Sequence, residues 1–174
     1  DASDEQHAYV GQMVRRAMER SDRIRYVKLS ENAGISANTN QAAKLAKGEY
    51  LALADHDDLL SPDACYQLAK AAFETKADFL YSDEALFTKD PKRPITGHFK
   101  PDFAPHYLEC CNYICHLAAF KRADFWAVGG LCPACDGAQD HDLFLKLTEG
   151  EKTVVHIPLV LYYWRVHAAS TSGG

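Results

Sequence analysis

Three carboxylates stand close together in the stretch GEYLALADHDDLLSP, which runs from Gly48 to Pro62. Asp55, Asp57 and Asp58 follow directly after a short apolar run. Because neighbouring carboxylates repel one another, the cluster destabilises a fold unless a cation or several hydrogen-bond donors compensate. Oxygen ligands suit Mg²⁺ or Mn²⁺, which keep open positions for phosphate oxygens. The D-x-D pattern therefore fits a site for a metal and a diphosphate, and the alternative is a solvated turn before a helix.

Cysteine spacing offers a second possible chemistry. Cys132 and Cys135 have the C-x-x-C spacing of redox and zinc sites. A second well-spaced pair is missing, since Cys110, Cys111 and Cys115 form an irregular set. We interpret the cysteines as reduced structural thiols of a cytoplasmic protein.

The elements that position these groups alternate between helix-like and strand-like patterns. This alternation predicts an α/β architecture with a largely parallel sheet. Ser36 and Ser61 are the expected N-caps of two of the helices. Expected helices cover 5–20, 36–47, 61–75 and 140–147, expected strands cover 24–29, 50–54, 79–81, 112–120, 153–157 and 160–164, and a long functional loop is expected over 84–105.

The strand expected over 50–54 determines where the carboxylate cluster lies in the sheet. Its uniformly apolar residues predict a strand buried on both faces. In open α/β sheets, ligands gather at the carboxyl ends of parallel strands. The aspartates stand at such an end.

Length and charge limit the class of protein. The 174 residues fit one domain, 1–174, and the net charge of −5 argues against non-specific binding of nucleic acid. No apolar run approaches the ~20 residues that span a bilayer. The acidic, polar start of the chain does not read as a signal peptide.

An ordered set of motifs resembles one enzyme family. The stretch ENAGISANTNQAAKLAKGEYLALADHDDLLSPDA resembles the donor-binding half of family-2 glycosyltransferases. FLYSDEALF, HFKPDFAP, NYICHLAAFKR, VGGL, GAQDHDLFLKL and IPLVLYYWRVHAAST follow in the order seen in bacterial members that build surface polysaccharides, rhamnose-containing ones among them. The similarity spans roughly Asp1 to Thr171, and the ordered set is more specific than any single motif.

The resemblance implies a GT-A fold, a Rossmann-like and mostly parallel sheet flanked by helices. It implies transfer of a sugar, with inversion, from a nucleotide-diphosphate sugar to a saccharide or lipid-linked acceptor, with Mn²⁺ or Mg²⁺ as cofactor. A cytoplasmic protein, peripheral at the inner face of the membrane, is the expected setting. Whether the domain forms an oligomer stays open.

The resemblance also implies roles for residues of the donor site. Asp57 is the expected metal ligand, and His167, in the W-R-x-H segment, is expected to complete the metal–diphosphate site. Asp55 is expected near the nucleotide ribose. Asn32 and Asn40 match positions that line the donor pocket.

Asp140, in GAQDHDL, matches the catalytic aspartate of the family. An inverting transfer needs one general base within hydrogen-bond reach of the acceptor hydroxyl. The first turn of a helix favours the ionised form that a base requires. The alternative for Asp140 is a helix-terminal charge or cap, and Asp142 is expected to be either a solvated acid or an acid that supports the site without contacting the substrate.

Two features depart from the family pattern. Thr39 stands where many relatives have Arg. The family begins with an apolar strand, a loop, a helix and a second strand, whereas this chain starts at DASDE. We therefore expect an N-terminally truncated domain that lacks the first strand and most of the second, with Asp1 as the remnant of the nucleotide pocket.

Several residues and two other functions stay open. Asp83 and Glu84 either face the donor sugar or acceptor or lie in a surface turn, and His98, His106 and His116 are interpreted as ordinary polar or packed histidines. One rival function is a metal-dependent phosphoryl-transfer or phosphatase enzyme that uses the aspartates of 55–58. The other is a degenerate, non-catalytic module that binds carbohydrate or a partner.

Overall fold

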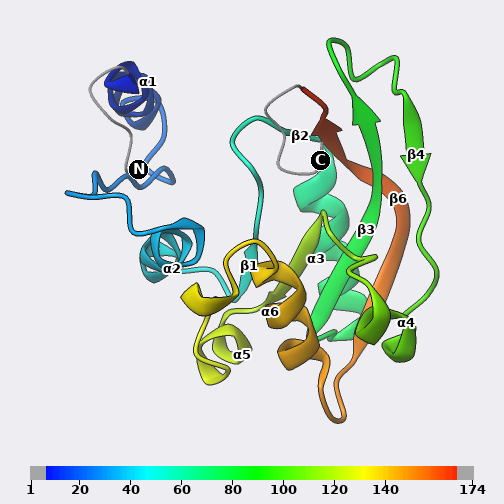
Figure 1. Cartoon of the computed structure of the whole chain (residues 1–174). Coiled ribbons are helices and arrows are strands. Elements are labelled where there is room, and N and C mark those ends of the chain that lie inside the picture. The colour runs from blue at the N-terminus through cyan, green and yellow to red at the C-terminus, as the bar shows by residue number, and fades with distance from the viewer. Residues whose placement is uncertain (1–6, 168–174) are drawn as a thin grey trace.

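The computed structural model describes residues 7–167 of the chain. Its helices are α1 (Tyr9–Met18), α2 (Ile35–Leu45), α3 (Ala64–Thr75), α4 (Pro105–Cys110), α5 (Arg122–Ala127) and α6 (Gln139–Thr148), with the short 3₁₀ helix η2 (Pro133–Cys135) before α6. Its strands are β1 (Tyr50–Ala52), β2 (Leu59–Leu60), β3 (Phe79–Phe87), β4 (Thr96–His98), β5 (Ala118–Lys121) and β6 (Val154–Arg165) (Figure 1). None of the helices in the described part has the length and apolar content that crossing a bilayer requires.

The strands form one mixed sheet in the order β1-β5-β3-β6-β2, with β4 beside β3. Among the described residues, only β3 and β6 pair in parallel, so the prediction of a mostly parallel sheet is wrong. Local hydrophobic patterns do not carry strand direction, and β5 inserts antiparallel between β1 and β3. β1, β3 and β6 nevertheless run in the same direction, so their carboxyl ends share one edge of the sheet.

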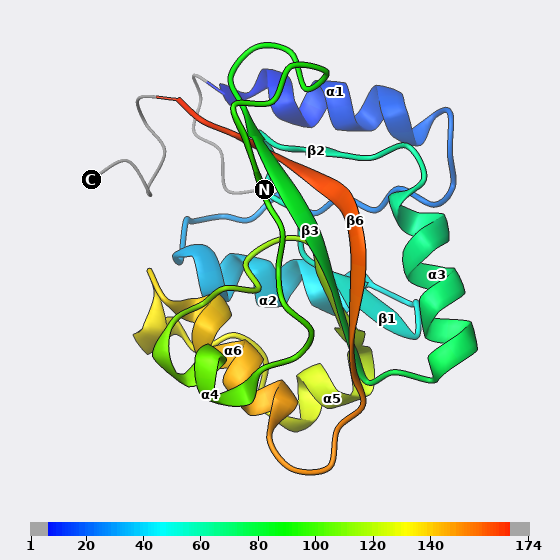
Figure 2. The same cartoon turned by 90° about the vertical axis from the view of Figure 1, so that its right-hand side faces the viewer.

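Helices cover both faces of this sheet, as Figure 2 shows, with α3 on one side and α4 and α6 on the other. Side chains of β3 alternate between the two layers, as the period of a strand requires. Phe79 and Tyr81 pack with the helices on the α6 side, whereas Leu80 packs with α3. β3 is therefore the centre of the core.

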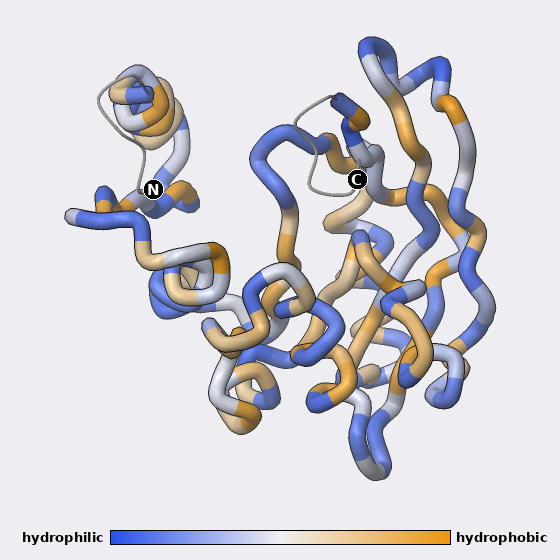
Figure 3. Tube along the Cα trace, in the orientation of Figure 1, coloured by the Kyte–Doolittle hydropathy of each residue, from blue (hydrophilic) through white to orange (hydrophobic). Residues whose placement is uncertain are grey.

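Strand β1 is shorter and less buried than the sequence predicts. It lies at the end of the strand order, and of its residues only Leu51 is buried, which corrects the expectation of burial on both faces. Figure 3 shows that the chain turns from apolar to hydrophilic in the loop between β1 and β2. The aspartate cluster lies in this loop.

The four predicted helices are confirmed, with shifted bounds. α2 begins at Ile35 after Gly34, whose φ of +91° favours glycine. Ser36 is buried inside the first turn and caps nothing. In α3 the cap position belongs to Asp63, and Ser61 donates its hydroxyl hydrogen to the Asp63 carboxylate.

Several strand predictions are wrong. Residues 24–29 form no strand, and the strand expected over 112–120 shortens to β5. The loop expected over 84–105 contains the end of β3 and its antiparallel partner β4. The two late strands are one, because β6 continues through Pro158 with a shift in its register against β3 between Ser82 and Glu84.

Candidate active site

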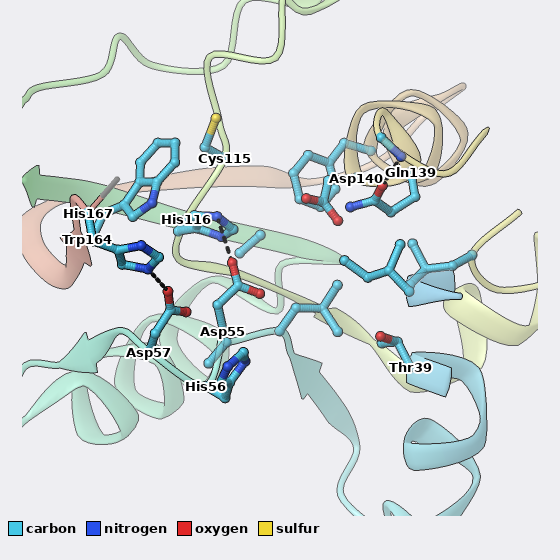
Figure 4. Close-up of a pocket in the computed structure, with 17 residues that line it drawn as sticks. Thr39, Asp55, His56, Asp57, Cys115, His116, Gln139, Asp140, Trp164 and His167 are labelled. Atoms are coloured by element: carbon cyan, nitrogen blue, oxygen red, sulfur yellow. Dashed lines mark hydrogen bonds and ion pairs between the residues drawn. The ribbon is translucent and has the colours of Figure 1, made fainter. Parts of the chain in front are cut away.

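A cavity of about 640 Å³ opens where the carboxyl ends of β1 and β6 meet the start of α6 (Figure 4). It brings together four side chains that the sequence analysis assigned to one site: Asp55, Asp57, Asp140 and His167. The remaining lining residues are Ile35, Thr39, Leu53, Ala54, His56, Cys115, His116, Ala118, Leu131, Gly137, Gln139, Phe144 and Trp164.

Strand β6 fixes the loop that carries the aspartates. The Tyr162 hydroxyl accepts a hydrogen bond from the backbone N–H of Asp55 (3.0 Å) and donates one to Asp58 Oδ2 (2.7 Å). Arg165 donates its backbone N–H to Asp58 Oδ1 (2.6 Å) and its Nε–H to the Asp57 carbonyl (2.7 Å). Burial raises the pKa of Tyr162, so its hydroxyl stays protonated and keeps donating. Asp58 is thus an anchor of the loop, which leaves Asp55 and Asp57 to face the cavity.

Asp57 and His167 meet at the open side of the cavity. His167 Nε2 lies 2.8 Å from Asp57 Oδ2, and this hydrogen bond holds the pKa of Asp57 below its ordinary value. A carboxylate oxygen and an imidazole nitrogen both suit Mn²⁺, and the carboxylate suits Mg²⁺. In the described part of the chain, no third acidic, His or Cys ligand completes a cluster around them. The pair fits an ion whose other positions are taken by phosphate oxygens and water.

Asp55 contacts a residue that the sequence analysis did not assign to the site. His116 Nε2 lies 3.6 Å from Asp55 Oδ2. The His116 ring stacks on Tyr162, with ring centroids 4.8 Å apart, and meets the Trp164 ring edge-on. The interpretation of His116 as an ordinary packed histidine misses this contact. Its position just before β5 carries no local signal, because only the antiparallel direction of β5 brings it to this edge.

Asp140 occupies the second position of α6, on the far side of the cavity from Asp57 (Figure 4). Burial raises the pKa of Asp140, and the nearby His116 partly opposes this. The start of the helix was expected to favour the ionised form of Asp140. Desolvation outweighs that effect. Gln139, one residue earlier, accepts a hydrogen bond from the backbone N–H of Gly137 (2.7 Å) and so orders the approach to the helix.

A buried ion pair supports the segment that carries Cys115 and His116. Lys100 Nζ donates to the carbonyl oxygens of Ser82 (2.7 Å), Ile114 (2.5 Å) and His116, and lies 3.4 Å from Glu84 Oε2. Glu84 is fully buried and also accepts the backbone N–H of His116 (3.2 Å). Glu84 therefore neither contacts a substrate nor lies in a surface turn.

Asp83 belongs to the same interior. It accepts the backbone N–H of Lys100 (2.9 Å), and its Oδ1 lies 2.8 Å from His156 Nε2. Asp83 is 4% exposed, which excludes both roles considered from the sequence.

The two asparagines assigned to the donor pocket lie outside the cavity lining. Asn40 holds the backbone of Leu131 from both sides, donating to its carbonyl (2.8 Å) and accepting its N–H (3.0 Å). Asn32 accepts hydrogen bonds from Gly34 (3.2 Å) and from the amide of Asn38 (2.7 Å). Asn40 therefore ties α2 to the segment at Leu131, and Asn32 fixes the turn before α2. Asp1 lies outside the described residues.

Sequence comparison identifies relatives of the chain. The model of the family described as glycosyl transferase family 2 matches residues 2–129. The O-antigen biosynthesis protein RfbC of Myxococcus xanthus is 34% identical over 176 residues, which cover 100% of this chain and 14% of that protein. The chain spans 18% and 14% of the lengths of two relatives above 30% identity, protein y4gI of Sinorhizobium fredii and RfbC.

Solved structures with the same fold include two that contain sugar donors. Staphylococcus aureus TarS 1–349 in complex with UDP-GlcNAc matches with a TM-score of 0.75 and 16% identity, over 98% of this chain and 49% of that one. The mannosyltransferase PcManGT from Pyrobaculum calidifontis, in complex with GDP-Man and Mn²⁺, matches with a TM-score of 0.66 and 20% identity, over 93% of this chain and 46% of that one. At these identities the likeness shows the fold.

Proposed function

The chain belongs to glycosyl transferase family 2, with the GT-A fold of that family's structures, and from this premise we propose its reaction. The domain transfers a sugar from a nucleotide-diphosphate sugar to a saccharide or lipid-linked acceptor, with inversion and with Mn²⁺ or Mg²⁺. The name of RfbC supports a place in surface polysaccharide biosynthesis. A cytoplasmic donor and a lipid-linked acceptor would place the domain at the inner face of the membrane.

One observation carries this proposal. A single cavity holds the Asp57–His167 pair on one side and the partly buried Asp140 across from it (Figure 4). An inverting transfer needs a leaving group and a base on opposite faces of the sugar ring. The space between the two groups is where we place the donor sugar.

The polar side chains at the two sides of the cavity then have separate roles. Asp57 and His167 hold the divalent cation, which when bound offsets the charge of the diphosphate leaving group. Asp140 accepts the proton of the acceptor hydroxyl as its oxygen attacks the anomeric carbon. Its raised pKa makes it a stronger base than an exposed carboxylate. Asp55 faces the nucleotide, held in place by His116.

The two rival functions leave some of the polar residues of this cavity without a role. A phosphatase needs an aspartate nucleophile in the 55–58 loop and gives no task to Asp140 or His167. A non-catalytic binding module has no need of a carboxylate with a raised pKa at the back of the cavity. Among the solved neighbours, TarS with UDP-GlcNAc and PcManGT with GDP-Man and Mn²⁺ support a nucleotide-sugar donor and a divalent cation.

A thermal-shift titration tests the donor site. The chain is melted with Mn²⁺ alone and with UDP, dTDP or GDP, beside an Asp57→Asn variant. We expect a nucleotide-dependent rise in melting temperature that requires Mn²⁺ and disappears in the variant. Sugar transfer from the preferred nucleotide sugar, measured with wild type and Asp140→Asn, then tests the reaction. Nucleotide binding without any transfer by wild type would favour the binding module.

A further inference from the structure

A second cluster of metal-ligand side chains lies outside the cavity. The ligand atoms of Cys132, Cys135 and Asp142 all lie within 4.8 Å of one another, and all three residues are half-buried. The sequence analysis set the cysteine pair aside because no further ligand stood at a regular spacing. We propose that these three residues bind one Zn²⁺ ion, which fixes the loop that leads to Asp140.

The separations suit zinc. Zn–S distances of about 2.3 Å and Zn–O distances of about 2.0–2.2 Å in a tetrahedral site place two ligand atoms roughly 3.5–3.8 Å apart. The cluster needs only small side-chain movements to reach this spacing. The fourth position is open to water. Thiolates select Zn²⁺ over Mg²⁺ and Mn²⁺, so this site and the Asp57–His167 pair differ in the metal they take.

The backbone presents the ligands on a short hydrogen-bonded path. The N–H of Cys135 donates to the carbonyl of Cys132 (2.9 Å), which closes a tight turn around Pro133 and Ala134. The N–H of Ala138 donates to the carbonyl of Cys135 (2.8 Å) and so joins this turn to α6. Asp142 then follows on the first turns of that helix. Both cysteines and the carboxylate are therefore held by regular local structure.

Charge is balanced when the ion is bound. Each thiol releases its proton to solvent, so two thiolates and one carboxylate carry one negative charge more than Zn²⁺ offsets. Lys146 Nζ lies 2.6 Å from Asp142 Oδ2 and supplies the missing positive charge. A carboxylate can bind an ion through one oxygen and accept a hydrogen bond at the other, which orients it.

The ion would act on the candidate active site through the loop 131–138. Ser36 of α2 donates its hydroxyl hydrogen to the Cys132 carbonyl (3.3 Å) and its backbone N–H to Asp136 Oδ1 (3.2 Å). A Cβ on Gly34 would stand 2.6 Å from the Asp136 carboxylate, so glycine permits this approach. Zinc would thus hold one loop between α2, which carries Thr39 of the cavity, and α6, which carries Asp140.

Cobalt binding tests the site directly and independently of sugar transfer. The reduced chain, stripped of metal, is titrated with Co²⁺, whose thiolate complexes absorb in the near ultraviolet. Zinc content is then measured with a colorimetric chelator. We expect one thiolate-bound ion per chain, displaced by Zn²⁺, and a rise in melting temperature on binding zinc.

Variants define the ligands. The Cys132→Ser/Cys135→Ser double variant should abolish the thiolate absorption, each single variant should lower it by about half or more, and Asp142→Asn should weaken zinc binding by at least about tenfold. The exposed cysteines give a matched control, since Cys110→Ser and Cys111→Ser should bind as wild type does. Asp57→Asn should also keep the cobalt signal, which separates this site from the donor site. Absence of thiolate absorption in the reduced wild type, or absorption in Cys132→Ser equal to that of wild type, would overturn the proposal.

Discussion

His116 and Asp55 lie 3.6 Å apart in the cavity, in two loops at the same edge of the antiparallel strands β5 and β1. Asp55 follows β1, and His116 precedes β5. Because β1 and β5 are antiparallel, the end of one and the start of the other share an edge of the sheet. His116 also acts on Asp140, since its positive charge when protonated lowers the pKa of that carboxyl group. The imidazole therefore links the loop of the aspartates to the proposed base.

Replacement of His116 should shift the pH dependence of transfer. In His116→Gln the positive charge that opposes the raised pKa of Asp140 is lost, so the acidic limb of the kcat profile should move to higher pH. His106→Gln is the matched control, because His106 is exposed and pairs with Glu109 (3.1 Å) on the surface. An unchanged acidic limb in His116→Gln would contradict an interaction between His116 and the base.

Asp140→Asn should separate activity from stability. Loss of a general base reduces kcat by roughly 10²–10⁴-fold, while nucleotide binding should persist. The folded-state pKa of Asp140 lies above its unfolded value, so the folded chain binds this proton more tightly. Between those two pKa values, stability falls as pH rises, because ionisation puts a charge in a desolvated position.

Asn carries no such charge. The variant should therefore melt at or above the wild-type temperature at neutral pH, and this difference should shrink below the ordinary carboxyl pKa. Thermal melts over a pH series check the sign. A variant that melts lower at every pH would mean that the ionised carboxylate stabilises the fold.

The helices were predicted well from local periodicity, whereas the contacts that depend on strand direction were not predicted. The spacing of Leu143, Phe144 and Leu147 predicted α6 within one residue at each end, because a 3.6-residue period is a local property. Resemblance to family motifs placed Asp57 and His167 together across 110 positions. Neither the helical periodicity nor the family motifs predicted that His116 contacts Asp55.

The buried positions of Asp83 and Glu84 were not predicted from the sequence either. Asp83 and Glu84 read as a strand end followed by a loop, because charged residues are rarely fully buried. Their partners include Lys100, His98 and His156, which lie beside them because β3 pairs with β4 and β6. A cation that neutralises a buried acid cannot be recognised from a single sequence when the two are joined by tertiary contacts alone.

The Asp57–His167 pair should bind Mn²⁺. Asp57→Asn and His167→Ala should each weaken Mn²⁺ binding by at least about tenfold, and a chelator should remove the nucleotide-dependent thermal shift from wild type. Asp63→Asn is the matched control, because Asp63 lies at the start of α3 and bonds to Ser61 and Gln67. Calorimetric titration with Mn²⁺ measures the effect. Equal affinity in Asp57→Asn and wild type would remove this pair from the metal site.

The same pair predicts a response to acid. The hydrogen bond from His167 lowers the folded-state pKa of Asp57, so its contribution to stability is present above the ordinary carboxyl pKa. It is lost as pH falls through the lowered value. Because both side chains are more than a third exposed, solvent screens the interaction and the loss should be small. Acid unfolding of His167→Ala beside wild type measures it.

Lys100 should matter far more to stability than an exposed lysine does. Lys100→Met removes the ammonium group that faces the buried carboxylate of Glu84 and donates to three backbone carbonyls, while the N–H of His116 and the His98 ring still contact Glu84. Removing one partner of a buried pair costs about 3–5 kcal/mol of unfolding free energy. Lys121→Met is the control, since the Lys121–Asp78 pair (2.7 Å) is partly exposed and should contribute less than about 1 kcal/mol. Urea denaturation compares the two variants.

Glu84→Leu in the Lys100→Met background tests the origin of that cost. If the loss in Lys100→Met comes from an unpaired buried charge, removing the carboxylate should restore part of the stability, because an apolar pair needs no compensation. The backbone carbonyls of Ile114 and His116 would still lack their donor, so recovery should be incomplete. Since this segment carries His116 into the cavity, the double variant should fold yet transfer sugar more slowly than wild type. Full recovery of stability and activity would show that Lys100 does not position the segment.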